Sequence, residues 1–166
     1  MKVSFSIKLS EKDLYLFNLR QAYRGMQGFL SILLPVLVFA YAIVGYGQVS
    51  PWSTLVYIGL GIVFLVYVPI SLWLRVRKVM RDENNAVSKT LRYQFEEEKI
   101  QVAVEKEQAE FLWDNIYRMI STKNYVYIYT NRMNAYILPM VQVGDSYKDL
   151  SNLAHAKLPK HRIQMK

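Results

Sequence analysis

Side chains suited to acid–base or metal chemistry are few and scattered in this sequence. Its 166 residues include two histidines, His155 and His161, and no cysteine. The histidines are six positions apart with Pro159 between them, and no acidic cluster accompanies them, so they lack the spacing of paired metal ligands on a helix. We therefore predict no metal site. Because cysteine is absent, disulfides and thiolate chemistry are excluded.

The remaining chemically active residue types also favour structural roles. Asp145 and Asp149 lie at the start of a predicted helix, where carboxylates cap backbone N–H groups more often than they catalyse. The run 96–98 of three glutamates is typical of a solvated turn. No glycine-framed nucleophile elbow and no phosphate-binding loop is present. We predict no catalytic residue, no cofactor and no enzymatic activity.

The dominant feature of the chain is an uncharged block. Residues 25–74 contain no Lys, Arg, Asp or Glu. Two apolar runs, 29–49 and 55–74, are separated by a turn-like segment at 46–52, and as helices each would be about 30 Å long, close to the ~30 Å hydrocarbon thickness of a bilayer. The block predicts a two-helix transmembrane hairpin. The alternative, a buried core of soluble helices, rarely shows apolar runs this long.

Basic residues are concentrated on both sides of this block. The flanks 1–24 and 75–84 supply +5 of the net charge of +8, whereas the connecting turn has no charge. Lys and Arg are retained on the cytoplasmic side, so both termini should be cytoplasmic. This distribution favours anionic lipid over nucleic acid as the partner of the charge. The residues expected to face the lipid headgroups are Arg20, Arg24, Arg75, Arg77, Lys78 and Arg81.

The sequence before the block predicts a strand and then an amphipathic helix within 1–24. Residues 2–8 alternate between apolar and polar side chains, which indicates a strand. The segment Ser10-Glu11-Lys12-Asp13 is a capping-box pattern that opens a helix. That helix either lies along the inner headgroups or continues into the first span. The segment 25–84 then comprises the hairpin and its basic flank.

Residues 85–166 predict a soluble domain built from short strands. Short strands are expected within 91–95, 100–105, 108–113, 117–122, 125–130 and 135–139, and apolar and polar residues alternate in the first two. Short strands at this spacing are typical of an antiparallel sheet that curls on itself. A second capping-box pattern at 146–149 begins a helix that runs to about Lys157. We therefore expect a membrane α+β protein, with a small antiparallel β-barrel-like domain closed by the C-terminal helix. Whether the N-terminal strand joins this domain stays open.

Three tyrosines alternate with aliphatic residues in one of these strands. Tyr125, Tyr127 and Tyr129 share one face, and Val126 and Ile128 share the other. In one interpretation the aliphatic side chains face the core and the tyrosines lie on a half-covered outer face. In the other, the tyrosines form an interaction surface for a partner chain or for the protein's own N-terminal strand, since Tyr is favoured at interfaces.

The order of these features resembles a known family. The runs 111–116 (FLWDNI), 125–129 (YVYIY), 137–139 (ILP) and 9–18 (LSEKDLYLFN) are similar to the YcxB-like family of bacterial membrane proteins. The resemblance implies a membrane protein with a C-terminal domain like a pleckstrin-homology (PH) domain. It implies no defined biochemical role.

Taken together, these features predict a scaffold, adaptor or regulatory module without catalytic activity. We expect it in the bacterial inner membrane, with several spans and both termini in the cytoplasm. Its partners would be the lipid bilayer and another membrane or cytoplasmic protein, and no nucleic acid. The alternative is a lipid- or ligand-sensing subunit of a transport or envelope-stress complex.

Overall fold

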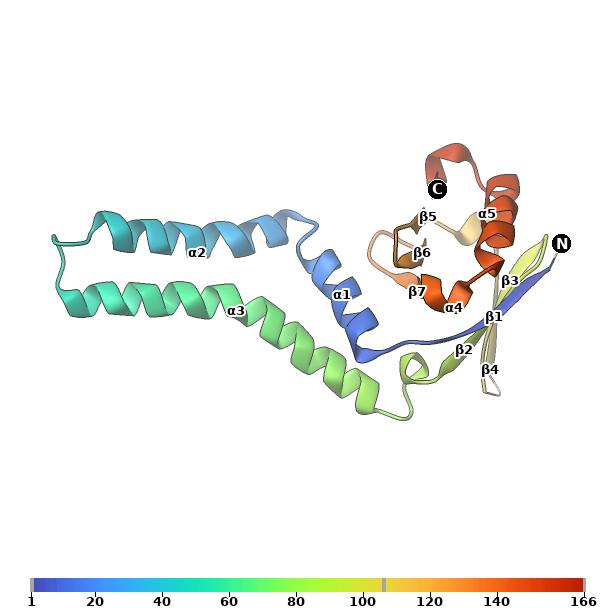
Figure 1. Cartoon of the computed structure of the whole chain (residues 1–166), viewed down its shortest axis with the longest axis horizontal. Helices are drawn as coiled ribbons and strands as arrows, with labels where there is room; N and C mark the ends of the chain where they lie inside the picture. Colours follow the sequence, from blue (N-terminus) through green and yellow to red (C-terminus); the bar gives the residue numbers. More distant parts are fainter. Residues whose placement is uncertain (1, 106, 166) are drawn as a thin grey trace. The chain divides into compact units, whose positions relative to one another are not determined.

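The computed structural model describes residues 2–105 and 107–165, and of Gln27 only the backbone. The chain divides into two compact units, whose elements are labelled in Figure 1. The helical unit is Tyr15–Lys78. The sheet unit combines Met1–Leu14 with Val79–Lys166. The N-terminal strand and the C-terminal domain of the sequence prediction therefore belong to one unit.

Three helices occupy the N-terminal half of the chain: α1 (Glu11–Ala22), α2 (Met26–Val44) and α3 (Pro51–Arg81). α1 is a separate helix and does not continue into α2, because Gly25 between them has an extended backbone. A Cβ atom on Gly28 would lie 2.4 Å from the Cα atom of Tyr23, so this close approach of the chain requires glycine. The start of α1 confirms the predicted capping box, since Ser10 and Asp13 each accept a hydrogen bond from the other's backbone N–H.

α2 and α3 lie side by side as an antiparallel pair (Figure 1). Gly61 of α3 packs directly against the ring of Phe39, where a Cβ atom would approach within 2.6 Å. The rings of Tyr41 and Tyr57 meet edge to face, with their centroids 5.0 Å apart. α2 ends at Val44, so the predicted bound of residue 49 was wrong. Gly45 is the C-cap residue, and Gly47 in the turn that follows has a left-handed backbone (φ 84°), a conformation that glycine adopts without steric cost.

Sheet A consists of four antiparallel strands in chain order: β1 (Val3–Lys8), β2 (Thr90–Phe95), β3 (Lys99–Val104) and β4 (Glu107–Leu112). β1 pairs with β2 from Val3 opposite Phe95 to Lys8 opposite Thr90. The N-terminal strand thus joins the C-terminal strands, which answers the question that the sequence left open. In sequence, the helical unit is an insertion between two neighbouring strands of one sheet.

Sheet B contains β5 (Arg118–Ser121), β6 (Tyr125–Tyr129), β7 (Ala135–Pro139) and β8 (Ile163–Gln164), in the order β7-β6-β5-β8. All pairs are antiparallel except the short β5–β8 pair. The 3₁₀ turn η2 (Trp113–Asn115) separates β4 from β5, and the strands of the described residues form two separate sheets. The expected barrel-like meander was therefore wrong, because the chain changes sheets at this turn instead of continuing one ladder.

The core of the sheet unit lies between the inner face of sheet A, sheet B and helix α5 (Ser146–Lys157). Tyr136 of β7 packs edge to face on Tyr93 of β2, and Trp113 lies beside Phe95. α5 buries Leu150, Leu153 and Ala154 and contacts β1. The capping box expected at 146–149 is wrong, since Asp145 is the N-cap residue and makes no side-chain capping bond. The short elements are η1 (Ala86–Ser88), α4 (Met140–Val143) and η3 (Lys160–Arg162).

Candidate anchor and polar sheet face

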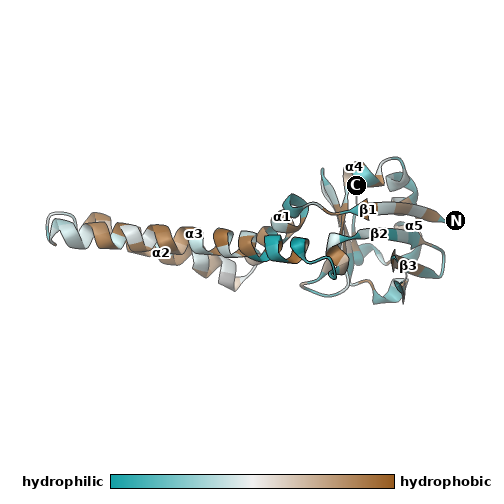
Figure 2. Ribbon diagram, turned by 90° about the horizontal axis from the view of Figure 1, so that it is seen from below, coloured by the Kyte–Doolittle hydropathy of each residue, from teal (hydrophilic) through white to brown (hydrophobic). Residues whose placement is uncertain are grey.

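The helical unit exposes many large apolar side chains. α3 is the one helix, among the described residues, that is long and apolar enough to cross a membrane; the described apolar part of α2, 28–44, is shorter. Ile43 and Val44 are each 75% exposed, and Leu55 is 61% exposed. Hydrophobic brown segments recur along both helices in Figure 2. Length and composition thus indicate membrane association.

The six basic residues predicted to face headgroups lie at the ends of this uncharged region. Arg20 and Arg24 are in α1 and the turn that follows it, and the other four are in the last turns of α3. Five of the six side chains are exposed. The guanidinium of half-buried Arg77 lies 5.0 Å from the ring centroid of Trp73, one helical turn earlier, in a cation–π contact. Contact of these six basic residues with lipid headgroups stays a prediction.

The predicted tyrosine stripe is mostly internal. Tyr127 and Tyr129 are buried, 4% and 1% exposed, whereas Tyr125 is half-buried. Val126 and Ile128 on the opposite face are fully buried, so both faces of β6 are covered. Only Tyr125 is therefore partly accessible on this strand. Its hydroxyl donates a hydrogen bond of 2.8 Å to Oδ1 of Asp13, which links sheet B to the start of α1.

Asp13 is the centre of a small polar cluster. Partial burial works to raise the pKa of this carboxyl, but hydrogen bonds from the Ser10 hydroxyl and backbone N–H, and from Tyr125, outweigh it and lower the pKa below its ordinary value of 3.8. Burial, together with the same contact, raises the pKa of Tyr125 to about 12. The pair therefore holds a carboxylate and a protonated phenol at neutral pH, which suits anchoring and not proton transfer.

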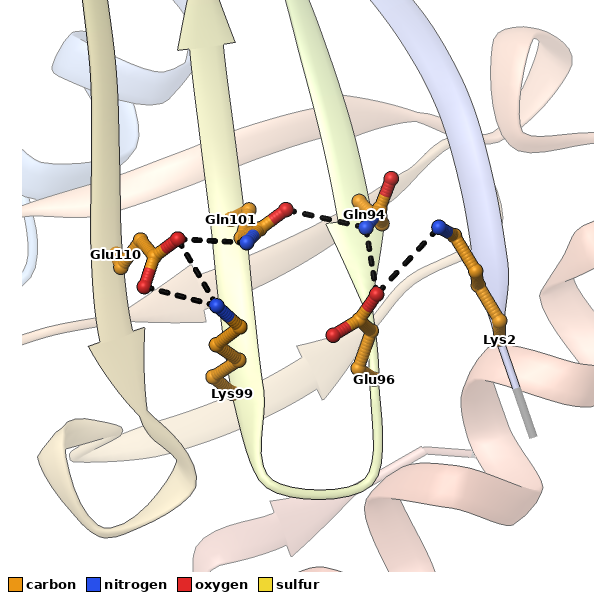
Figure 3. A network of polar contacts seen from close by, with 6 residues as sticks. All are labelled: Lys2, Gln94, Glu96, Lys99, Gln101 and Glu110. Atoms are coloured by element: carbon orange, nitrogen blue, oxygen red, sulfur yellow. Dashed lines mark hydrogen bonds and ion pairs between the residues drawn. The ribbon is translucent and has the colours of Figure 1, made fainter.

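The outer face of sheet A carries a hydrogen-bonded network that crosses the strands (Figure 3). The Gln94 amide donates to the Gln101 carbonyl oxygen at 3.0 Å, and the Gln101 amide donates to a Glu110 carboxylate oxygen at 2.6 Å. The orientation of the Gln101 amide is fixed, because its oxygen accepts from Gln94 while its nitrogen donates to Glu110. A row of polar side chains on one sheet face is thereby held in a defined arrangement.

Two ion pairs close the ends of this network. The Lys99 ammonium lies 3.0 Å from both carboxylate oxygens of Glu110, and this contact lowers the pKa of Glu110. At the other end the Gln94 amide also donates to Glu96, and Glu96 pairs with Lys2 at 3.4 Å. Figure 3 shows the six side chains joined in one continuous line, from Glu110 on β4 to Lys2 just before β1.

Next to this network lies an open basin of about 430 Å³. It forms around Arg92, whose neighbours in register are small or flexible: Ser6 on β1, Ala103 on β3, and Gln108 opposite Ala103 on β4. Side chains and backbone lining the basin belong to Ser4, Phe5, Ser6, Arg92, Tyr93, Gln94, Gln101, Ala103 and Gln108. The exposed guanidinium has no carboxylate partner among the described residues.

An apolar hollow of about 520 Å³ lies within the helical unit, near the turn that joins α2 and α3. Phe39, Ala42 and Ile43 contribute from α2, and Ile58 contributes from α3. Its walls are hydrocarbon apart from Thr54 and the Tyr46 hydroxyl. This hollow therefore has no polar groups that would orient a specific ligand.

The candidate chemical residues are dispersed in the described structure. His155 Nδ1 lies 2.8 Å from the Ser151 carbonyl one turn earlier in α5, and His161 lies in η3. No group of three or more potential metal ligands occurs among residues 2–105 and 107–165. Burial raises the pKa of Tyr93 far above its ordinary value, so this core phenol stays protonated. The arrangement supports binding and packing roles.

Sequence reasoning did not identify Gln142 of α4. Its side-chain oxygen accepts from the Lys8 N–H at 2.8 Å, and its amide donates to the Lys8 carbonyl at 2.9 Å. Gln142 thus makes the two bonds that a further strand would make with the edge of β1, and it shields that edge. A lone glutamine after Pro139 gives no sequence signal for such a contact, because its partner is 134 positions away.

Comparison with known proteins finds a family model that matches one segment of the sheet unit. Residues 95–154, from the end of β2 into α5, match the family model described as YcxB-like protein. The resemblance inferred from the sequence is thereby confirmed for this segment, which contains the Trp113–Ile116 turn and strands β6 and β7. No curated protein and no solved structure gives a significant match to the chain.

Proposed function

We propose that this chain is a membrane-anchored adaptor or scaffold without catalytic activity, located in the bacterial inner membrane. In this proposal α2 and α3 both cross the bilayer as a hairpin, and both termini are cytoplasmic. The sheet unit, a PH-like domain of two sheets and one C-terminal helix, recruits or regulates a protein partner at the cytoplasmic face.

The observation that carries the anchoring part is the exposure of apolar side chains on two paired, charge-free helices. Soluble monomers rarely expose contiguous apolar patches larger than a few hundred Å². Here large apolar residues on both helices are at least half exposed, among them Phe29, Leu37, Leu55 and Val63. Lipid tails solvate such side chains without the cost that water imposes. Paired helices also satisfy their backbone groups internally, as hydrocarbon requires.

Helix lengths and charges support the orientation. α2 has 19 residues and α3 has 31, which correspond to about 28 Å and 46 Å. α3 therefore exceeds the ~30 Å hydrocarbon layer, and its surplus includes the basic turns that begin at Arg75. Arg77 over Trp73 combines a cation and an amphipathic ring, the residue types enriched at membrane interfaces. The turn 45–50 between the helices contains no charged residue.

The adaptor part rests on the character of the sheet unit. Its polar side chains form structural bonds and line open polar basins, and the titratable groups of its described residues do not converge on a reacting position. A fixed polar surface on a rigid sheet is suited to recognition. The runner-up role, a sensor for anionic lipid, predicts a basic surface on the sheet unit. Sheet A instead mixes both signs, because Glu96, Glu105 and Glu110 accompany its lysines.

Two measurements test the proposal. After alkaline carbonate washing of bacterial membranes, the intact chain should stay in the pellet and dissolve only in detergent; release into the wash would rule out the anchor. For the adaptor role, a photo-crosslinking amino acid is placed at exposed Gln108 and, as a matched control, at exposed Met133. A discrete protein adduct at one position only supports a defined partner. Lipid adducts alone at both positions would favour the sensor.

A further inference from the structure

Arg92 differs from most other cations on the outer face of sheet A: like Lys8 at the end of β1, it makes no ion pair with the described residues. Lys2 is paired with Glu96, Lys89 with Glu105, and Lys99 with Glu110. Arg92 lies among these pairs on the central strand β2, yet it makes no ion pair with the described residues. A guanidinium offers five donors in a planar fork that matches a carboxylate, so an unpaired one retains its full capacity for an oxyanion.

The surroundings of Arg92 leave space for such a ligand. Its flanking positions across the sheet are Ser6 and Ala103, whose side chains are too short to cover the guanidinium. The resulting basin of about 430 Å³ accommodates a side chain or a short stretch of polypeptide. Ser4, Ser6 and Gln108 contribute hydroxyl and amide donors to its rim. The basin thus places one positive charge among neutral donors.

The network beside the basin keeps this rim rigid. Gln94 and Gln101 are held by hydrogen bonds of 3.0 and 2.6 Å, in a line that ends in the Lys99–Glu110 ion pair (Figure 3). Ordered side chains lose little conformational freedom when a ligand binds, which favours affinity. The same network occupies the neighbouring carboxylates, so neither Glu96 nor Glu110 is free to neutralise Arg92.

From this arrangement we infer that the Arg92 basin is a recognition site for an acidic side chain, Asp or Glu, in a partner polypeptide lying across sheet A. The charge balance of the face favours a polypeptide over a bilayer. Three carboxylates accompany the basic residues of this face, those of Glu96, Glu105 and Glu110. Although each pairs with a lysine, they repel a continuous anionic surface. A single carboxylate with neutral or basic neighbours avoids that repulsion and pairs with Arg92.

This inference names the partner chemistry of the proposed adaptor and rests on that proposal. It is tested on the full chain, ¹⁵N-labelled, in dodecyl maltoside micelles. The signal is the Arg92 side-chain Nε–Hε resonance. The probes are the peptide acetyl-Ser-Glu-Ser-amide and the same peptide with Gln in place of Glu. We expect a saturable shift with the Glu peptide and none with the Gln peptide.

Two variants identify the site. Arg92→Gln should weaken binding of the Glu peptide by at least about tenfold, as expected for loss of a charged hydrogen-bonding partner. Its matched control is Arg132→Gln, which makes the same charge change at an exposed turn and should leave binding unchanged. Ala103→Leu keeps the charge, fills the basin and should also weaken binding. In each variant, peptide binding is followed by shifts of the backbone resonances, which also show whether the variant is folded.

Three results would overturn the inference. The first is an equal shift with the Gln peptide, and the second is equal weakening by the Arg92 and Arg132 variants. The third is a shift of Arg92 with phosphatidylglycerol added to the micelles but not with the Glu peptide, which would assign the site to lipid. Carbonate extraction is independent of all three. An extracted chain that still binds the Glu peptide would refute the anchor alone, and a retained chain that does not bind would refute this site alone.

Discussion

Replacing Tyr125 with Phe removes one hydroxyl from the contact between sheet B and the start of α1. That hydroxyl donates at 2.8 Å to Asp13, which also accepts bonds from Ser10 at 2.7 and 3.0 Å. Hydrogen bonds to charged groups contribute roughly 1.5–3 kcal/mol, and this carboxylate is partly exposed and keeps two other donors, so we expect a loss of about 1 kcal/mol. For a unit of this size that corresponds to a melting shift of about 4–8 °C.

The assay follows the sheet unit alone. The chain has three tryptophans, and only Trp113 belongs to that unit. Thermal unfolding is measured by Trp113 fluorescence in a chain with Trp52→Phe and Trp73→Phe, in micelles. Tyr117→Phe, which removes an exposed hydroxyl, is the control and should leave the midpoint unchanged. A double-mutant cycle with Asp13→Asn isolates the coupling between the two side chains.

The pH dependence of folding stability tests the same contact, because the shift of the Asp13 pKa fixes the direction of the change. The pKa of Asp13 is lowered in the folded chain, so its stabilising contribution is complete above its ordinary pKa of 3.8 and is lost as pH falls through the lower folded value. The stability difference between wild type and Asp13→Asn should therefore shrink below about pH 4. An unchanged midpoint in Tyr125→Phe, zero coupling in the cycle, or a difference that persists unaltered to strongly acidic pH would refute this account of the contact.

Three further predictions concern packing and connectivity. Gln142→Ala should destabilise the sheet unit by about 1 kcal/mol, because the backbone N–H and carbonyl of Lys8 both lose their hydrogen bonds to the Gln142 side chain. Urea unfolding measures the effect, and Val141→Ala, at a 94% exposed position of the same helix, is the control. Gly61→Ala should destabilise the helical hairpin by about 1–3 kcal/mol in micelles, because the added Cβ meets the ring of Phe39. Gly59→Ala, whose added Cβ would meet no neighbouring atom, should have no such effect. Equal effects of the two substitutions would contradict the contact between Gly61 and Phe39. A chain in which a four-residue glycine-rich linker joins Leu9 directly to Lys89 should fold without detergent. Its amide groups in β1 and β2 should stay protected from hydrogen exchange, because the pairing of the two strands is kept. An aggregated product would show that the sheet unit depends on the helices.

Local periodicity predicted most of the secondary structure. Strands β1 to β7 coincide closely with the short runs expected between turns, and α5 ends before Pro159 as expected, because these signals depend on neighbouring residues only. The division into two sheets was not predicted. It depends on the 3₁₀ turn at Trp113–Asn115. The indole N–H of Trp113 in this turn donates a hydrogen bond to the backbone carbonyl of Glu96, which is distant in sequence. β8 was also missed, since two residues give no periodic signal.

The candidate surfaces were predicted less completely, for the same reason. Charge counting identified the basic flank, because topology is set by residues adjacent in sequence. The tyrosines of β6 were assigned to one face correctly, but their burial depends on segments far away in the chain, such as the one containing Asp13. The Arg92 basin requires the register of four strands, with Ser6, Ala103 and Gln108 in one row. No local pattern specifies that register.

The central claim, a hairpin that crosses the membrane twice, is tested most directly by cysteine labelling. The natural chain has no cysteine, so Gln48→Cys in the helix-connecting turn and Lys123→Cys in the exposed β5–β6 turn each provide one reactive site. In intact spheroplasts a membrane-impermeant maleimide should modify position 48 and not position 123, and lysis should make position 123 reactive. Labelling of position 123 before lysis, or protection of position 48 until lysis, would contradict the account.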